Sequence, residues 1–203
     1  MARPLEAVST KPRVHRGFVV FKWLVYAILA VDVVLYARFG RATELLDTAA
    51  WFVLLLLFEW ETGGWRLESR WRALLHGARG LACVAIAAAV AGYAFEGEWL
   101  DFANESVWLG VIALLELEVR LPPSAVRLHR LRRGLAGVLY LALVGFLLTW
   151  SAMALHEADA SAALLDAWDA LWWLVAFLVI ELNVFGVAVE QQMRLQVKQR
   201  VVE

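Results

Sequence analysis

Charged residues are scarce in this chain. They make up only 19% of its 203 residues, whereas hydrophobic residues make up 62% and the mean hydropathy is +0.65. A soluble domain is about 45–50% apolar and about 25% charged. The shortage of charge therefore excludes a disordered chain, a nucleic-acid-binding domain and an ordinary soluble enzyme.

Cysteine is nearly absent as well, since Cys83 is the only one. A single cysteine excludes a disulfide within the chain. The four histidines lack the spacing of metal ligands, and the sequence contains no Gly-rich phosphate loop, no nucleophile elbow and no histidine pair placed for haem. We therefore expect no enzymatic activity, no cofactor and no bound metal.

What the chain does have is long apolar segments. A membrane-spanning helix needs about 20 mostly apolar residues. Six segments meet this need: 17–37, 46–64, 79–95, 101–119, 133–155 and 168–189. The first is too long for the core of a signal peptide, so we expect an uncleaved anchor. The sequence predicts an all-α, polytopic membrane protein in which 1–203 is a single membrane domain.

The loops between these segments alternate in charge. All but two of the Lys and Arg residues lie in or beside four segments: 1–16, 65–78, 120–132 and 190–203. The other three loops carry only Arg38 and Arg41 and are otherwise acidic. Basic loops stay in the cytoplasm, so we predict that both termini are cytoplasmic, in a membrane such as the bacterial inner membrane.

Two basic stretches could interact with the membrane surface. Residues 65–72 mix aromatic and basic side chains, which suits a short helix in the headgroup region. Arg127, Arg130 and Arg133 recur every third residue. They are either topology determinants or a site for anionic lipid.

Four positions recur in every second apolar segment, in the pattern Asp/Asn-x3-Trp-x7-Glu-x-Glu/Asn. The three copies are Asp47, Trp51, Glu59 and Glu61; Asn104, Trp108, Glu116 and Glu118; and Asp169, Trp173, Glu181 and Asn183. The alternate segments open at Arg16, Arg79 and Arg133, each followed by Gly. The sequence therefore predicts three hairpin repeats, approximately 13–64, 76–119 and 130–190. We expect them to form a pseudo-threefold bundle about an axis along the membrane normal.

The recurring glutamates Glu59, Glu116 and Glu181 lie inside the predicted spans, about 18 Å past the Asp/Asn position. A charge at this depth costs about 2.5–3.5 kcal/mol, and Asp32 adds a further buried acid. Two interpretations follow. Either an arginine of each hairpin (Arg16, Arg79 or Arg133) pairs with its glutamate as a structural clasp, or the glutamates line a path for a cation or a proton.

Tryptophan and small residues also follow a pattern. The recurring Trp51, Trp108 and Trp173 fit either an outer aromatic belt or a constriction above the glutamates. In the third segment, small residues recur at Ala78, Ala82, Ala85, Ala89 and Gly92. This spacing permits close helix approach and makes the third segment the best candidate for a tightly packed centre of the bundle.

The run 101–120 resembles the second helix of voltage-sensor domains. In that family an aromatic residue and then an acidic residue form the site that arginines pass, and Trp108 and Glu116 are the matching positions. Trp51 with Glu59 and Trp173 with Glu181 match in the same loose way. No predicted span carries an arginine at every third position, so the resemblance implies an ion-related role rather than voltage sensing.

Two functions remain open. The chain is either an ion- or proton-conducting channel or ion-coupled transporter that uses its intramembrane glutamates, or a non-catalytic membrane subunit or scaffold with structural Arg–Glu pairs. We expect its partners to be the lipid bilayer, with anionic lipid at the basic loops, and other membrane subunits or further copies of itself, but not nucleic acid.

Overall fold

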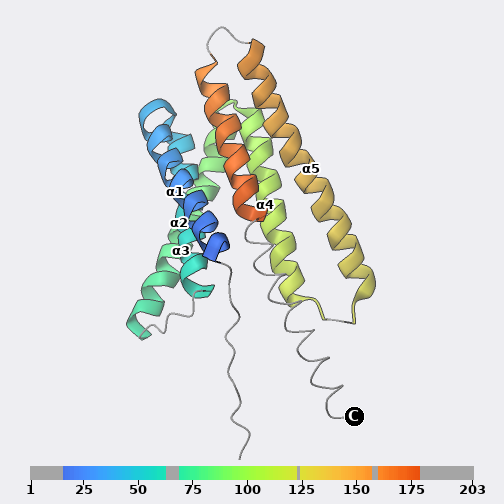
Figure 1. Cartoon of the computed structure of the whole chain (residues 1–203). Coiled ribbons are helices and arrows are strands. Elements are labelled where there is room, and N and C mark those ends of the chain that lie inside the picture. Colours follow the sequence, from blue (N-terminus) through green and yellow to red (C-terminus); the bar gives the residue numbers. More distant parts are fainter. Residues whose placement is uncertain (1–15, 63–68, 123, 157–159, 179–203) are drawn as a thin grey trace, which may run out of the picture.

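The structure is a computed structural model that describes residues 16–62, 69–122, 124–156 and 160–178. The regular structure in these ranges is entirely helical, which confirms the predicted fold class. The six helices are α1 (Arg16–Phe39), α2 (Ala42–Thr62), α3 (Ser69–Glu96), α4 (Trp99–Arg120), α5 (Val126–His156) and an unlabelled sixth helix (Ser161–Leu178), drawn orange-red in Figure 1.

Four stretches within these helices are long and apolar enough to cross a membrane: Gly17–Phe39, Ala73–Glu96, Val126–His156 and Ser161–Leu178. They overlap the predicted segments 17–37, 79–95, 133–155 and 168–189. Helices α2 and α4 have 21 and 22 residues and are therefore long enough as well, but they carry several acidic residues each. By length and composition, four of the described helices could thus cross a membrane, and α2 and α4 bring their acidic residues in among them.

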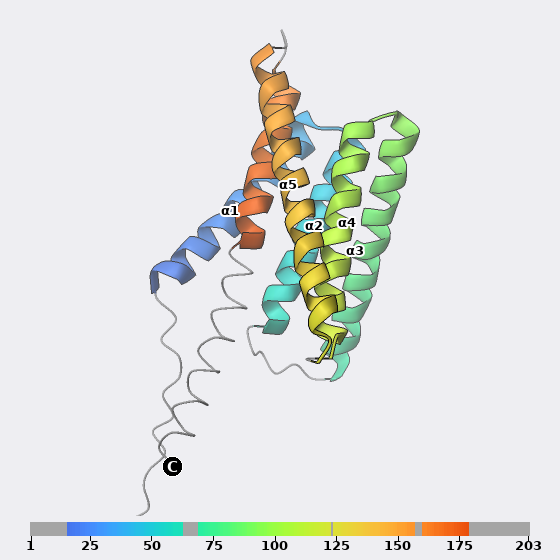
Figure 2. The same cartoon turned by 90° about the vertical axis from the view of Figure 1, so that its right-hand side faces the viewer.

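Consecutive helices run in opposite directions, so their connecting turns lie alternately at the two ends of the bundle (Figures 1 and 2). The turns at 40–41 and 97–98 lie at one end, which we call the acidic end. Its charged residues include Arg38 in the last turn of α1 and the ion-paired group Arg41, Glu44, Glu96, Glu98 and Asp101. The turn at 97–98 requires a glycine, because Gly97 has a φ of 81°. The threefold symmetry and the side of the membrane on which each end lies stay predictions.

Three helices begin at least seven residues earlier than the predicted segments. Helix α3 begins at Ser69 instead of 79, α5 at Val126 instead of 133, and the sixth helix at Ser161 instead of 168. The charged residues at these helix starts were predicted to belong to loops, because the predicted segments included only mostly apolar sequence. Arginine is nevertheless a good helix former, and aspartate is stabilised in the first turns by the helix dipole. The expected separate helix over 65–72 is also wrong in part, since residues 69–72 belong to α3.

All six helices contribute to one apolar core. It includes Leu29 of α1, Leu55 of α2, Ile86 of α3, Val111 of α4, Leu143 of α5 and Phe177 of the sixth helix. Large apolar side chains also cover the outside of the bundle, and Leu81 and Leu141 are exposed by 71% and 73%. An outer surface of this kind is suited to lipid rather than to water.

The predicted close packing of the third helix holds on one face. Ala82 and Ala89 of α3 are buried, and α3 makes its most extensive contacts with α2. A Cβ atom added at Gly92 would meet Thr43 Cγ2 of α2 at 2.9 Å. The opposite face, which includes Leu81 and Val84, is exposed. Helix α3 is therefore tightly packed against α2 but lies at the side of the bundle.

Candidate functional site

Acidic side chains meet inside the bundle, next to the aromatic part of the core. Two cavities of about 10 and 20 Å³ adjoin there, and Asp47, Thr48, Glu105 and Asp169 line both. We call this site the acidic pocket. Three helices supply these residues, namely α2, α4 and the sixth helix. The described lining of the two cavities contains no Lys, Arg or His.

The first pair of acids in the pocket is Asp47 and Glu105. They are only 6% and 5% exposed, and their carboxyl groups interact directly. The Tyr93 hydroxyl donates a hydrogen bond to Asp47 Oδ2 over 3.1 Å, and Trp51 Nε1 donates one to Glu105 Oε2 over 2.9 Å. Asp47 Oδ1 is buried and has no donor among the described residues.

The second pair is Asp32 and Asp169. Asp32 is fully buried on α1, and its carboxyl group interacts with that of Asp169. Within the described part of the chain, neither oxygen of Asp32 nor Oδ1 of Asp169 receives a hydrogen bond from a donor group. Beside this pair, the Tyr36 hydroxyl donates to Asp166 Oδ1 over 2.9 Å.

Arg41 forms the centre of an ion-pair network at the acidic end. Its guanidinium lies 2.6 Å from Glu44, 3.1 Å from Asp101 and 4.0 Å from Glu96, and it also pairs with Glu98. Partial burial lowers the pKa of Arg41, but its hydrogen bonds and charge interactions with Glu44 and Glu98 raise that pKa above the ordinary value. One permanent cation thus faces four carboxylates, so the entrance to the pocket stays net negative.

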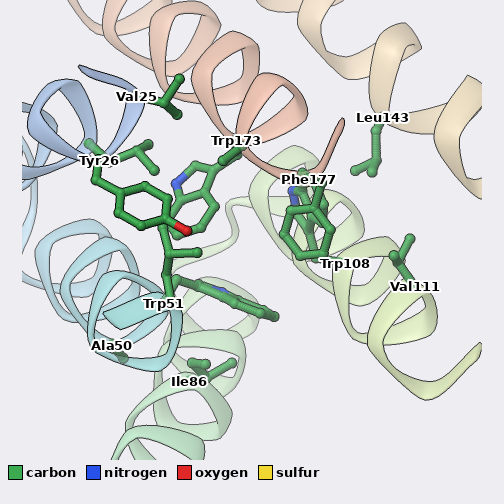
Figure 3. Packing of buried hydrophobic residues seen from close by; sticks show 13 residues of the cluster. Val25, Tyr26, Ala50, Trp51, Ile86, Trp108, Val111, Leu143, Trp173 and Phe177 are labelled. Carbon is green, nitrogen blue, oxygen red and sulfur yellow. The ribbon is translucent and has the colours of Figure 1, made fainter. Parts of the chain in front are cut away.

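The recurring tryptophans lie directly beneath the acids. Trp51, Trp108 and Trp173 are 8%, 6% and 6% exposed and line the smaller cavity together with Phe177. Trp51 packs edge-on against Trp173 at 6.2 Å between ring centroids, and Trp108 lies 4.6 Å from Phe177 (Figure 3). The interpretation of these residues as an interfacial belt is wrong, because they pack inside the bundle rather than against lipid headgroups.

The predicted intramembrane glutamates do not meet in this pocket. Glu59 pairs with Lys22 of α1 and accepts a hydrogen bond from the Tyr26 hydroxyl over 3.1 Å. Glu61 pairs with Arg79 at 2.6 Å and Glu116 with Arg120 at 2.5 Å, both near the surface. Each of Glu59, Glu61 and Glu116 therefore has its own cation, and none of the three lines the acidic pocket.

The predicted Arg–Glu clasps need a correction. Arg79 pairs with Glu61 of the preceding helix instead of Glu116 of its own hairpin, because α3 packs most closely on α2. The exposed Arg133 donates to the carbonyl of His129 over 3.4 Å. The remaining predicted residues are outside the description: Glu181 and Asn183 lie beyond the described ranges, and the side chains of Arg16 and Glu118 are not described.

The repeated outer positions, in contrast, come together. Asp47 and Asp169 line both cavities, and Asn104 lines the larger one. Sequence reasoning missed their neighbours Glu105, Asp166 and Tyr93, which it left among loop acids or did not consider. A signal was present in the spacing, since Asp166 and Asp169 are three residues apart and so share one helix face.

No family model, curated protein or solved structure matches this chain. The resemblance to voltage-sensor domains also gains no support from the geometry. Trp108 is buried in the core, whereas the Glu116 side chain is 60% exposed and paired with Arg120. The function must therefore be argued from the acidic pocket itself.

Proposed function

We propose that the chain is an ion-conducting channel or ion-coupled transporter that takes up cations through the acidic pocket. In this proposal α2 and α4 also cross the membrane, held between their apolar neighbours. The observation that carries the proposal is that Asp47, Glu105 and Asp169 line the same two cavities inside the bundle, with Asp32 beside Asp169 and no basic residue in the described cavity lining.

The energetics support an ion-related role. Each uncompensated charge in a membrane interior costs about 2.5–3.5 kcal/mol on insertion scales, and four acids converge here. Two adjacent buried carboxylates repel each other strongly. They therefore need either a bound cation between them or a proton that neutralises one of them. The pocket thus has a built-in affinity for positive charge, and the net negative cluster around Arg41 attracts cations to its entrance.

A second candidate is a non-catalytic subunit or scaffold, and the pairs Lys22–Glu59, Arg79–Glu61 and Arg120–Glu116 favour it. These pairs fasten helices or stabilise one helix, as structural clasps do. They do not account for the acidic pocket, where acids meet without a clasp. Apolar residues would hold the helices together there at lower cost.

Flux measurements in proteoliposomes separate the two functions. We expect the purified chain to carry Na⁺, K⁺ or H⁺ down an imposed gradient, and we expect Asp47→Asn with Glu105→Gln to abolish that flux. Glu61→Gln is the matched control, because its carboxylate is half-exposed, pairs with Arg79 and lies outside the lining of the described cavities; it should keep the flux. If the wild type carries none of the three cations, the scaffold function takes the place of the transport function.

A further inference from the structure

The two acid pairs have the arrangement of groups that share a proton. Asp47 Oδ2 accepts a hydrogen bond from the Tyr93 hydroxyl, and Glu105 Oε2 accepts one from the Trp51 indole. Asp47 Oδ1 is buried and has no donor among the described residues. A hydrogen bond between two carboxyl groups exists only when one of them is protonated. One proton between Asp47 and Glu105 therefore supplies the missing donor.

The same reasoning applies more strongly to Asp32 and Asp169. Three of their four oxygens are buried and receive no hydrogen bond from a donor group of the described chain. An unsatisfied buried acceptor costs about 1–3 kcal/mol, and more when it is charged. A proton shared by these two carboxyl groups satisfies two oxygens at once and removes one charge.

The size of the pocket favours the proton over a metal cation. A water molecule needs about 10–15 Å³, so cavities of about 10 and 20 Å³ hold about one water each. A cation that keeps part of its hydration shell needs several waters around it. In addition, no three His, Cys, Asp or Glu side chains in the described ranges are arranged to coordinate a metal ion.

Aromatic side chains separate this pocket from a second cavity. Trp51, Trp173 and Phe177 line both the smaller polar cavity and an apolar cavity of about 290 Å³, which also contacts Glu116. Figure 3 shows Trp51, Trp173 and Phe177 converging on the middle of the bundle from α2 and the sixth helix. A hydrated metal ion cannot pass this aromatic floor without a large opening, whereas a proton needs only a transient chain of water.

We propose, as a deepening of the proposed function and resting on it, that the species handled at this site is the proton. The pairs Asp47–Glu105 and Asp32–Asp169 each hold one shared proton. Release transfers it from a carboxyl oxygen to a water in the cavity and leaves the pair with one more negative charge. Trp51, Trp173 and Phe177 form the barrier that protons cross and metal cations do not.

Other titratable groups surround the two pairs and belong to the same system. On the helices that pack around the pocket these are Tyr36 of α1, Glu44 of α2, Tyr93 of α3, Asp101 of α4 and Asp166 of the sixth helix. Helix α5 contributes only the neutral Trp150 to the described lining. The nearest described cation is Arg41, which pairs with Glu44 and Asp101 at the entrance.

The test uses the full chain in liposomes of neutral lipid that enclose a pH-sensitive dye. A K⁺ diffusion potential set by valinomycin drives proton uptake, and Na⁺ and K⁺ fluxes are measured in parallel samples without the ionophore. We expect proton flux without Na⁺ or K⁺ flux. Glu105→Gln and, separately, Asp169→Asn should lower the proton flux at least tenfold, while the control Glu61→Gln, whose half-exposed carboxylate pairs with Arg79 away from both cavities, keeps it.

Infrared difference spectroscopy gives a second readout. The wild type at neutral pH should show the carbonyl stretch of protonated carboxylic acids, and Glu105→Gln should lose part of that band. Metal-cation flux without proton flux overturns the proton assignment and leaves the proposed function standing, whereas the absence of all flux overturns both. A wild type without the carboxylic-acid band, or unchanged proton flux in both pocket variants, overturns the shared-proton pairs.

Discussion

Single charged residues in this chain have two kinds of surroundings. Glu59, Glu61 and Glu116 each have a basic partner, and their pairs differ mainly in exposure. In the pocket, Asp47 and Glu105 have a tyrosine and a tryptophan donor instead, and the Trp51 indole is both a hydrogen-bond donor to Glu105 and part of the aromatic floor. Pairing with a cation thus marks the structural acids, and pairing with another acid marks the candidate functional ones.

Removing one member of the Lys22–Glu59 pair should destabilise the protein. The two side chains are only 14% and 19% exposed, so Glu59→Gln leaves a poorly solvated ammonium without its partner. We expect a loss of about 3 kcal/mol, measured as the free energy of unfolding in detergent micelles.

The double variant Lys22→Met with Glu59→Gln should lose less unfolding free energy than the sum of the losses in the two single variants. Glu61→Gln is the control, because the Arg79–Glu61 pair is 42% and 44% exposed and should contribute less than about 1 kcal/mol. If Glu59→Gln and Glu61→Gln lowered the unfolding free energy equally, the conclusion that the Lys22–Glu59 pair is buried and the Arg79–Glu61 pair is not would be wrong.

Whole helices differ in how they balance polarity. Helices α2 and α4 carry the acids that pair with one another or with basic residues, and α1, α3 and α5 present broad apolar surfaces on the outside of the bundle. Close contact between α2 and α3 is possible because Gly92 has no side chain where it faces Thr43. This contact also fixes the position of Tyr93, which lies next to Gly92 and donates to Asp47.

Substitution of Gly92 should therefore disturb both packing and the pocket. A Cβ atom at this position meets Thr43 Cγ2 at 2.9 Å, so Gly92→Val should cost about 1–3 kcal/mol of stability through overpacking. In the same helix, a Cβ atom at Gly80 meets nothing within 4 Å. Gly80→Ala should be neutral or stabilising by up to about 1 kcal/mol. Thermal unfolding of the two variants in micelles checks the contrast.

At the scale of the whole molecule, hydropathy and charge patterning predicted the helical class and the approximate position of each helix. They failed at helix starts such as 126–132 and 161–167, where charged residues are helical. The repeat identified Asp47, Asn104 and Asp169 as equivalent positions, and the structure brings them to one pocket. The glutamates looked more important than they are. The sequence does not show that Lys22 lies within reach of Glu59, whereas the i,i+4 spacing of Glu116 and Arg120 was a readable signal of a pair within one helix.

The predicted topology is also a property of the whole molecule, and it is open to a direct test. In a Cys83→Ser background, cysteine placed at Glu98 lies in the turn of the acidic end, and cysteine placed at Ser124 lies in the connection between α4 and α5. Basic loops remain in the cytoplasm. A membrane-impermeant maleimide added to intact cells should therefore label position 98 and not position 124. Labelling of both positions from outside would refute the alternating topology.

The uneven polarity of the helices has a consequence for biogenesis. Helices α2 and α4 hold several carboxylates each, and α2 follows α1 and α4 follows α3 across turns of only two residues. An acidic helix of this kind partitions poorly into lipid when it leaves the insertion channel alone. Each should therefore enter the bilayer together with the apolar helix before it, as a preformed pair that hides its acids. Nascent chains that stop after α1 or α3 should integrate stably, whereas α2 or α4 expressed alone should be rejected by the insertion machinery.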